Sequence, residues 1–359
     1  MPHGTSDPRE PDVLVHTEGR AGFLTLNRPR AINALTHAMV RLIDEALTGW
    51  EHDPAVDTVV IRGAGERGLC AGGDIRAIHA DARAGGTESV DFWRDEYRLN
   101  ARIARYPKPY VAFMDGIVMG GGVGVSGHGS VRIVTERSRV AMPETGIGFV
   151  PDVGGTYLLS RAPGELGTHL ALTGAQAGPA DAILAGLADH FVASADLPAL
   201  AAELSRVPAA EAVASFARPA PPGELAEQRA WIDDGYAADT VEGIVERLTD
   251  SGVVAAKETA GVLLTRSPTA LKATLAAVRG ARELDSLESV LNMEFRLSCA
   301  ALVSPDLVEG IRAQVVDKDR DPRWTPPTLG GVTSEATARW FAPSPYGELG
   351  LTAPGGRDH

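Results

Sequence analysis

The 359-residue sequence contains only two cysteines, Cys70 and Cys299, which lie far apart in the chain. Neither belongs to a CxxC pair or to a Cys/His pattern with the spacing of a zinc site, and the histidines are scattered. The two thiols could pair, but free thiols in a reducing compartment are the simpler interpretation. We therefore expect no bound metal.

Basic residues are outnumbered, with 34 Lys and Arg against 47 Asp and Glu and a formal net charge of −13. That balance argues against general nucleic-acid binding and against docking on anionic membranes, because both need a basic surface. No stretch approaches the ~18 uninterrupted apolar residues of a transmembrane helix. The first residues, MPHGTSDPREPD, contain no apolar signal-peptide segment. We expect a cytoplasmic protein without nucleic-acid or membrane partners.

Aromatic residues make up 5% of the chain, whereas glycine (40) and proline (24) are abundant, so tight turns are frequent. Before residue 160, short apolar strands alternate with glycine loops and helical segments, which favours an α/β architecture. By composition the chain divides into a disordered tail over 1–11, a core with the active site over 12–197, an Ala/Pro-rich connector over 198–223, a helical region over 224–326 and a peripheral tail over 327–359.

One short stretch, A-M-P-E-T-G-I-G-F-V-P-D-V-G-G-T-Y at 141–157, places two carboxylates among apolar residues and glycines. Glu144 and Asp152 have no basic residue in this stretch to pair with. Burying an unpaired carboxylate is costly or raises its pKa, which is typical of acid/base groups in an active site. Each could instead begin a helix, where an acidic residue suits the helix dipole.

Two glycine loops, L-C-A-G-G-D-I at 69–75 and M-G-G-G-V-G at 119–124, each follow an expected strand and open an expected helix. Glycines at such a point let backbone N–H groups approach a ligand, and two donors aimed at one carbonyl form an oxyanion hole. The glycines could instead only permit tight packing. A G-x-G-x-x-G match at 122–127 lies too close to the next expected strand for the crossover helix of a dinucleotide site.

Several of these segments together resemble the crotonase (enoyl-CoA hydratase/isomerase) superfamily. They are L-N-R-P-R-A-I-N-A-L at 26–35, both glycine loops and M-P-E-T-G-I-G-F-V-P-D-V-G-G at 142–155. Within the superfamily, the chain is most similar to 3-hydroxyisobutyryl-CoA hydrolases. That similarity continues through S-P-T-A-L-K at 267–272, M-E-F-R-L-S at 293–298 and E-G-I-R-A at 309–313, and covers roughly residues 12–326. The resemblance implies a spiral of ββα repeats followed by a helical C-terminal region.

The resemblance also implies a binding site for an acyl-CoA thioester. The backbone N–H groups of Gly73 and Gly121 would form the oxyanion hole, and Glu96 aligns with a position that contacts substrate. Arg28 and Arg30 fall in a segment that lines the CoA site in such proteins. No metal and no redox cofactor would be needed, and coenzyme A would enter as part of the substrate. Relatives often form homotrimers or hexamers, although the longer C-terminal region could cover that surface.

The carboxylates distinguish between the reactions of this superfamily. Its hydratases use two glutamates, and here Gly124 stands at the first position while Glu144 matches the second. Asp152 stands where hydratases usually carry glycine, as in the hydrolases of 3-hydroxyisobutyryl-CoA, an intermediate of valine breakdown. The resemblance therefore implies thioester hydrolysis, with Glu144 as nucleophile or general base and Asp152 assisting.

Two alternatives stay open at this point. A hydratase or isomerase acting on another acyl-CoA would need a second acid/base in place of Gly124, with Asp152 the candidate. A catalytically silent acyl-CoA-binding protein would bind CoA thioesters without turnover.

Overall fold

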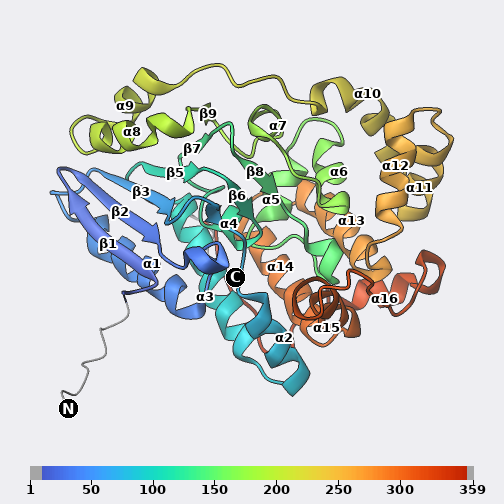
Figure 1. Ribbon diagram of the computed structural model, residues 1–359. Helices are drawn as coiled ribbons and strands as arrows, with labels where there is room; N and C mark the ends of the chain where they lie inside the picture. The colour runs from blue at the N-terminus through green and yellow to red at the C-terminus, as the bar shows by residue number, and fades with distance from the viewer. Residues whose placement is uncertain (1–9, 354–359) are drawn as a thin grey trace, which may run out of the picture.

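A computed structural model describes residues 10–353, which form two β-sheets surrounded by helices (Figure 1). The larger sheet has the strand order β1-β2-β3-β5-β7-β9 and the smaller has the order β4-β6-β8. Only β1 and β2 pair antiparallel, and the other pairs are parallel. The strands are β1 (Val13–Glu18), β2 (Ala21–Leu26), β3 (Thr58–Gly63), β4 (Gly68–Cys70), β5 (Tyr110–Met114), β6 (Ile117–Met119), β7 (Val131–Val134), β8 (Arg139–Ala141) and β9 (His190–Phe191).

From β3 onward, the two sheets receive strands in turn. β3, β5 and β7 join the larger sheet, and the strand after each of them, β4, β6 or β8, joins the smaller one. Each pair of strands is thus one step along a spiral, and successive steps stack through parallel pairing. This arrangement confirms the predicted crotonase-like α/β fold.

The larger sheet is covered on both faces, because alternate side chains of each strand point to opposite sides. Phe23 and Val60 pack with Leu200 and Val213 in one cluster, whereas Leu24 belongs to the main core. In Figure 1, α8 (Leu197–Leu204) and α9 (Ala209–Phe216) lie across one side of this sheet, and α1 (His37–Glu51) and α3 (Glu88–Ala104) lie across the other.

The segment predicted as a connector at 198–223 therefore contains most of α8 and all of α9. Its alanines favour helix, and leucines and a valine spaced along both helices are buried on the sheet. The proline-rich stretch after α9 has no regular structure. The boundaries proposed from composition do not separate cores, because one cluster of buried apolar residues runs from Val13 to Leu349.

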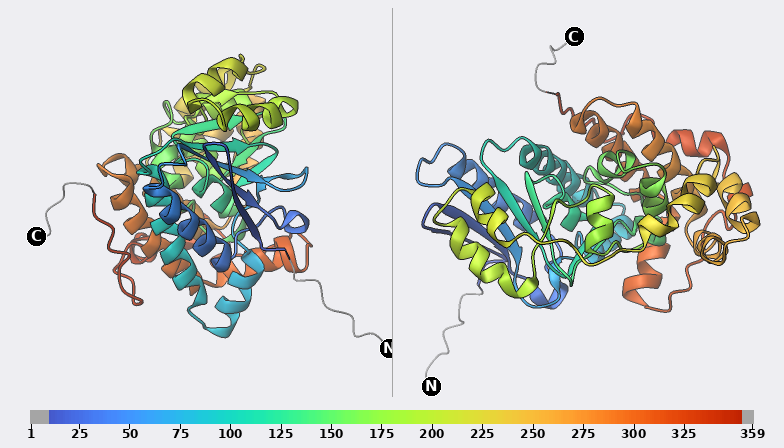
Figure 2. Two further views of the ribbon diagram at one scale, coloured as in Figure 1. Left: turned by 90° about the vertical axis from the view of Figure 1, so that its left-hand side faces the viewer. Right: turned by 90° about the horizontal axis from the view of Figure 1, so that it is seen from above.

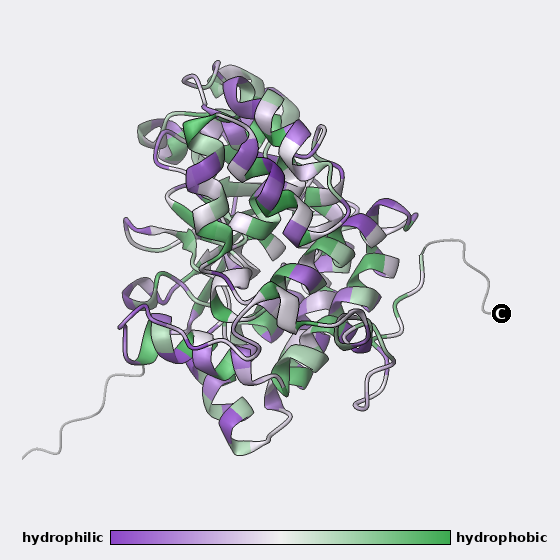
Figure 3. Ribbon diagram, turned by 90° about the vertical axis from the view of Figure 1, so that its right-hand side faces the viewer, coloured by the Kyte–Doolittle hydropathy of each residue, from purple (hydrophilic) through white to green (hydrophobic). Residues whose placement is uncertain are grey.

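From α10 (Leu225–Tyr236) onward the chain is helical and gathers to one side of the sheets (Figure 2). The remaining helices are α2 (Ile75–Ala84), α4 (Gly121–Gly124), α5 (Gly155–Ser160), α6 (Leu166–Thr173), α7 (Pro179–Leu184), α11 (Val241–Asp250), α12 (Val254–Leu263), α13 (Pro268–Arg282), α14 (Leu287–Leu302), α15 (Pro305–Ile311) and α16 (Ser334–Arg339). The outer helices α11 and α12 bury one face each, whereas α13 and α14 are buried over most of their length, and hydrophobic and hydrophilic residues are interleaved along the outer ones (Figure 3). No helix within residues 10–353 is long and apolar enough to cross a membrane.

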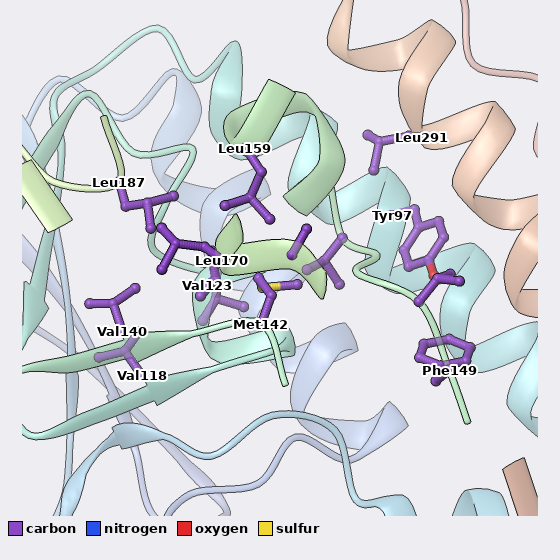
Figure 4. Packing of buried hydrophobic residues seen from close by; sticks show 14 of the residues in the cluster. Tyr97, Val118, Val123, Val140, Met142, Phe149, Leu159, Leu170, Leu187 and Leu291 are labelled. Carbon is purple, nitrogen blue, oxygen red and sulfur yellow. The ribbon is translucent and has the colours of Figure 1, made fainter. Parts of the chain in front are cut away.

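Helix α14 packs directly against α3 and α5 of the spiral. Its Leu291 belongs to the same buried cluster as Tyr97 of α3 and Phe149 (Figure 4). The segment predicted as a peripheral tail over 327–359 also packs on α3 through its described residues. Arg94 of α3 donates to the backbone carbonyl of Tyr346 at 2.9 Å. Of the tail predicted over 1–11, residues 1–9 lie outside the described range.

Helix α15 meets the 3-10 turn η2 (Glu144–Ile147) at a glycine contact. A Cβ on Gly310 would lie 2.4 Å from the backbone carbonyl carbon of Ile147, so Gly310→Ala would force the two segments apart. We expect this substitution to lower the free energy of unfolding by about 1–3 kcal/mol, measured by urea denaturation. Gly261→Ala in α12 is the matched control: nothing lies within 4 Å of its Cβ position, so alanine should stabilise the helix slightly. Equal losses in both variants would contradict this interpretation.

Candidate active site

The site forms where the three strands of the smaller sheet end. Strands β4, β6 and β8 run parallel, so their carboxyl ends lie at one edge. Gly73, Gly121 and Glu144 each follow one of these ends by two or three residues. Residues from three separate motifs are therefore brought together by strand pairing alone.

The two glycine loops lie close together, and a side chain at Gly121 would crowd both the other loop and Glu96. A Cβ on Gly121 would lie 3.3 Å from the backbone nitrogen of Gly73 and 2.7 Å from Glu96 Oε1. Among residues 10–353, the N–H groups of Gly73 and Gly121 have no backbone or side-chain acceptor. Two adjacent unpaired donors at one end of a cavity have the geometry required of an oxyanion hole.

Both loops open into a cavity of about 300 Å³. The polar groups in its wall include the carboxyls of Glu96, Glu144 and Asp152, and one cation, Arg266, lies among them. Apolar side chains form most of the remaining lining. They come from α2, α3, the turn η2 with the loop after it, and helix α15: Ile75, Ile78, Phe92, Trp93, Ile147, Phe149, Leu307 and Ile311. Such a pocket suits a ligand with a polar centre and an apolar body.

Two of the carboxyls have oxygens without a partner. Glu144 is 6% exposed and its Oε2 has no hydrogen-bond partner among the described residues; the same is true of Oε1 of Glu96, which is 2% exposed. Burial raises the pKa of both groups well above the usual range, and the nearby carboxylate of Asp152 raises each pKa further. These are buried acids held ready for a ligand rather than groups in ion pairs.

Asp152 has a hydrogen-bond partner. Its Oδ2 accepts a bond of 2.7 Å from the hydroxyl of Tyr97. Burial raises the pKa of Asp152 to about 7, and the bond from Tyr97 opposes that rise because it stabilises the ionised form. Asp152 thus titrates in the range where a group can both give and accept a proton.

Sequence analysis did not identify the residues behind Asp152. Glu294 of α14 accepts hydrogen bonds from the backbone N–H groups of Gly154 (2.6 Å) and Thr156 (2.9 Å), and so fixes the loop after Asp152. Burial raises the pKa of Glu294 to about 8. A signal was present, because Glu294 stands between Leu291 and Leu297 on the apolar face of an amphipathic helix, where a carboxylate is unexpected.

The predicted CoA-contacting arginines do not line this cavity. Arg28 instead forms an ion pair of 3.0 Å with Asp74 and donates to the carbonyl of Ala34 at 2.5 Å, so it braces the first glycine loop. Arg30 is exposed. The cation in the cavity wall is Arg266, whose guanidinium donates twice to the carbonyl of Thr173, at 3.1 and 2.7 Å.

Neither a metal nor a thiol nucleophile is indicated within the described part of the chain. Residues 10–353 contain no group of three or more His, Cys, Asp or Glu side chains that could hold a metal ion. Cys70 lies beside the first glycine loop, but burial raises its pKa to about 12, which keeps the thiol protonated.

Comparison with known proteins gives consistent results. The sequence profile described as enoyl-CoA hydratase/isomerase matches residues 21–341. The chain is 45% identical over 352 residues to the mitochondrial 3-hydroxyisobutyryl-CoA hydrolase of Danio rerio, covering 95% of this chain and 92% of the relative. It is 55% identical to a solved structure described as a carnitinyl-CoA dehydratase from Mycobacterium thermoresistibile, with a TM-score of 0.92 over 94% of this chain and 98% of the other. A structure described as an enoyl-CoA hydratase from Rhodobacter sphaeroides is 46% identical, with a TM-score of 0.90, covering 95% of this chain and 100% of the other.

The predicted cytoplasmic location is wrong by this comparison. The relative from Danio rerio is named as a mitochondrial protein, as are its vertebrate counterparts. The prediction depended on composition and on a missing apolar segment, and neither property records the compartment in which a folded chain works.

The raised pKa of Asp152 has a consequence for stability. Because its pKa rises from 3.8 to about 7 on folding, the folded protein loses stability as pH increases through that interval, where this acid is ionised in the unfolded chain but still protonated in the folded one. We expect Asp152→Asn to gain about 2–3 kcal/mol over the wild type when urea unfolding at pH 8 is compared with pH 5. Asp91→Asn, at an exposed position of α3, is the control. A gain of equal size at both pH values would show that ionisation of Asp152 is not the cause.

Proposed function

The chain belongs to the enoyl-CoA hydratase/isomerase family, and within it we propose that this protein is a thioester hydrolase that converts 3-hydroxyisobutyryl-CoA and water to 3-hydroxyisobutyrate and CoA. The observation that carries the proposal is the buried pair of Glu144 and Asp152 in one cavity with the unpaired N–H groups of Gly73 and Gly121. No cofactor is needed beyond the coenzyme A of the substrate.

In this proposal the two glycine N–H groups bind the thioester oxygen. They are fixed in place before the substrate arrives, so they stabilise the negative charge that develops on oxygen when the carbonyl carbon is attacked. The mostly apolar lining of the cavity lowers the dielectric around this point, which strengthens the effect. Glu96, whose Oε1 lies beside Gly121 without a partner, is placed to accept a hydrogen bond from the substrate hydroxyl.

Glu144 and Asp152 then divide the chemistry, sharing one proton between them. Transfer of the shared proton from Glu144 to Asp152 leaves Glu144 ionised. Glu144 then either attacks the thioester carbon to give a mixed anhydride or removes a proton from the attacking water. The C–S bond breaks, and protonated Asp152 gives its proton to the departing CoA sulfur. Trapping with hydroxylamine distinguishes the two routes, because only the anhydride route leaves Glu144 as a hydroxamate.

The hydratase alternative meets a steric obstacle at Gly124. A Cβ there would lie 2.7 Å from Val153 Cβ and 2.9 Å from Asn100 Nδ2, so the position that carries a glutamate in hydratases has no room for a side chain. This observation favours hydrolysis, although two similar solved structures are described as a hydratase and a dehydratase. Gly124→Glu should accordingly unfold or weaken the protein rather than create a hydratase.

Two finer points belong to the same proposal. The long anionic part of CoA would leave the cavity past Arg266, the cation in its wall. Assembly into a trimer or hexamer stays a prediction, and analytical ultracentrifugation would test it.

The proposed reaction is tested by release of free CoA thiol from 3-hydroxyisobutyryl-CoA, with hydration of crotonyl-CoA followed in parallel. We expect thiol release to fall about 100- to 1,000-fold in both Glu144→Gln and Asp152→Asn, because each removes a proton-transferring or attacking group while keeping its shape. Glu288→Gln is the control: Glu288 is buried but pairs with Arg105 outside the cavity.

The same assays separate the alternatives. Rapid hydration without thiol release would contradict the proposal in favour of the hydratase. Tight binding of both thioesters without turnover would favour the silent binding protein.

A further inference from the structure

Behind Asp152 lies a buried chain of hydroxyl groups that leads away from the cavity. Tyr97 Oη is 2.7 Å from Asp152 Oδ2 and 2.6 Å from Ser298 Oγ on helix α14. Ser298 Oγ is in turn 3.0 Å from the backbone carbonyl oxygen of Glu294. Tyr97 and Ser298 are both 0% exposed, and neither lines the cavity. The two hydroxyls therefore touch Asp152 from its protein side and not from the side of the substrate.

The number of hydroxyl hydrogens determines which group donates to which along this chain of hydrogen bonds. Each hydroxyl carries one hydrogen, which it can donate once. When Asp152 is ionised, Tyr97 donates to Asp152, so Ser298 donates to Tyr97. When Asp152 is protonated, it donates to Tyr97, Tyr97 donates to Ser298, and Ser298 donates to the carbonyl of Glu294. Every hydrogen has an acceptor in both arrangements.

We infer that Tyr97 and Ser298 are positioning residues whose hydrogen-bond chain reverses when Asp152 gains or loses its proton, which lets this buried acid cycle between both states during turnover. The inference rests on the proposed hydrolysis, in which Asp152 gives a proton to the CoA sulfur as the C–S bond breaks. Asp152 regains a proton when water is consumed, either directly from the water that cleaves the anhydride or by transfer from Glu144. Over one cycle a thioester and water become an acid and a thiol, and both carboxyls return to their starting states.

Three other buried carboxyl groups lie near Asp152, and the carboxylate of Asp152 raises the pKa of each. Glu96 faces it from α3, Glu144 from the turn η2 and Glu294 from α14, and no basic side chain within residues 10–353 pairs with it. Tyr97 is the one side chain among the described residues that forms a hydrogen bond with its carboxyl group. The reversible hydrogen-bond chain thus stabilises Asp152 in both protonation states, whereas an ion pair would stabilise only the ionised state.

The reversal is tested by titrating Asp152 directly. In infrared spectra recorded against pH, the carbonyl band of the protonated acid is assigned by its loss in Asp152→Asn. In Tyr97→Phe the ionised form loses a charge-assisted donor, so the midpoint should rise by about one pH unit. In Ser298→Ala the protonated form leaves the Tyr97 hydrogen without an acceptor, so the midpoint should fall. The variant Tyr236→Phe, which removes a buried hydroxyl that contacts His169 away from the cavity, should leave it unchanged.

Thiol release is measured on the same variants. Tyr97→Phe and Ser298→Ala should lower kcat about 10-fold with KM nearly unchanged, because neither side chain touches the substrate. Opposite shifts of the titration midpoint support the reversing chain, whereas unchanged midpoints or shifts in the same direction overturn it. If the wild type releases no thiol, the proposed function fails, and the infrared midpoints still decide the inference.

Discussion

The cost of keeping several carboxyl groups out of water governs the arrangement around the cavity. Glu96, Glu144, Asp152 and Glu294 are all buried, and burial raises the pKa of each. Within residues 10–353 none of these four acids forms a salt bridge, so they remain buried only where hydrogen-bond donors and a large apolar core offset the penalty. The spiral provides the glycine loops and Tyr97, and helix α14 provides Ser298 and Glu294. The C-terminal helices are therefore part of the active site rather than an appendage to it.

Much of the fold was predictable from sequence because its signals are local. Apolar runs broken by glycines indicated the strands, and the order of these runs favoured α/β. Parallel pairing then explains why Gly73, Gly121 and Glu144 meet, although their spacing along the sequence does not predict it. The region at 198–223 was misjudged because its alanines and prolines give opposite signals. Contact with the sheet decides the matter, and Leu200 is fully buried there.

The rest of the site was not predictable in this way, because it depends on contacts between distant segments. Tyr97 and Ser298 are 201 residues apart, and the bond of Glu294 to the Gly154 amide spans 140 residues. Each of these residues lies in a helix that would look ordinary on its own, apart from the carboxylate on an apolar face. Arg28 shows the converse: it matches a ligand-binding segment, yet its partners are Asp74 and a backbone carbonyl.

The hydrogen bonds between Glu294 and the loop after Asp152 also determine when, during synthesis, the protein becomes able to catalyse its reaction. During synthesis the spiral leaves the ribosome well before α14 exists, and closing so long a loop is entropically slow. Until then, the Gly154 and Thr156 amides lack their acceptor and Tyr97 lacks its second partner. A nascent chain that lacks α14 would contain every strand of the spiral, but Asp152 would not yet be held in position. Hydrolytic activity should therefore appear late in synthesis and all at once, a built-in latency that needs no inhibitor or pro-segment.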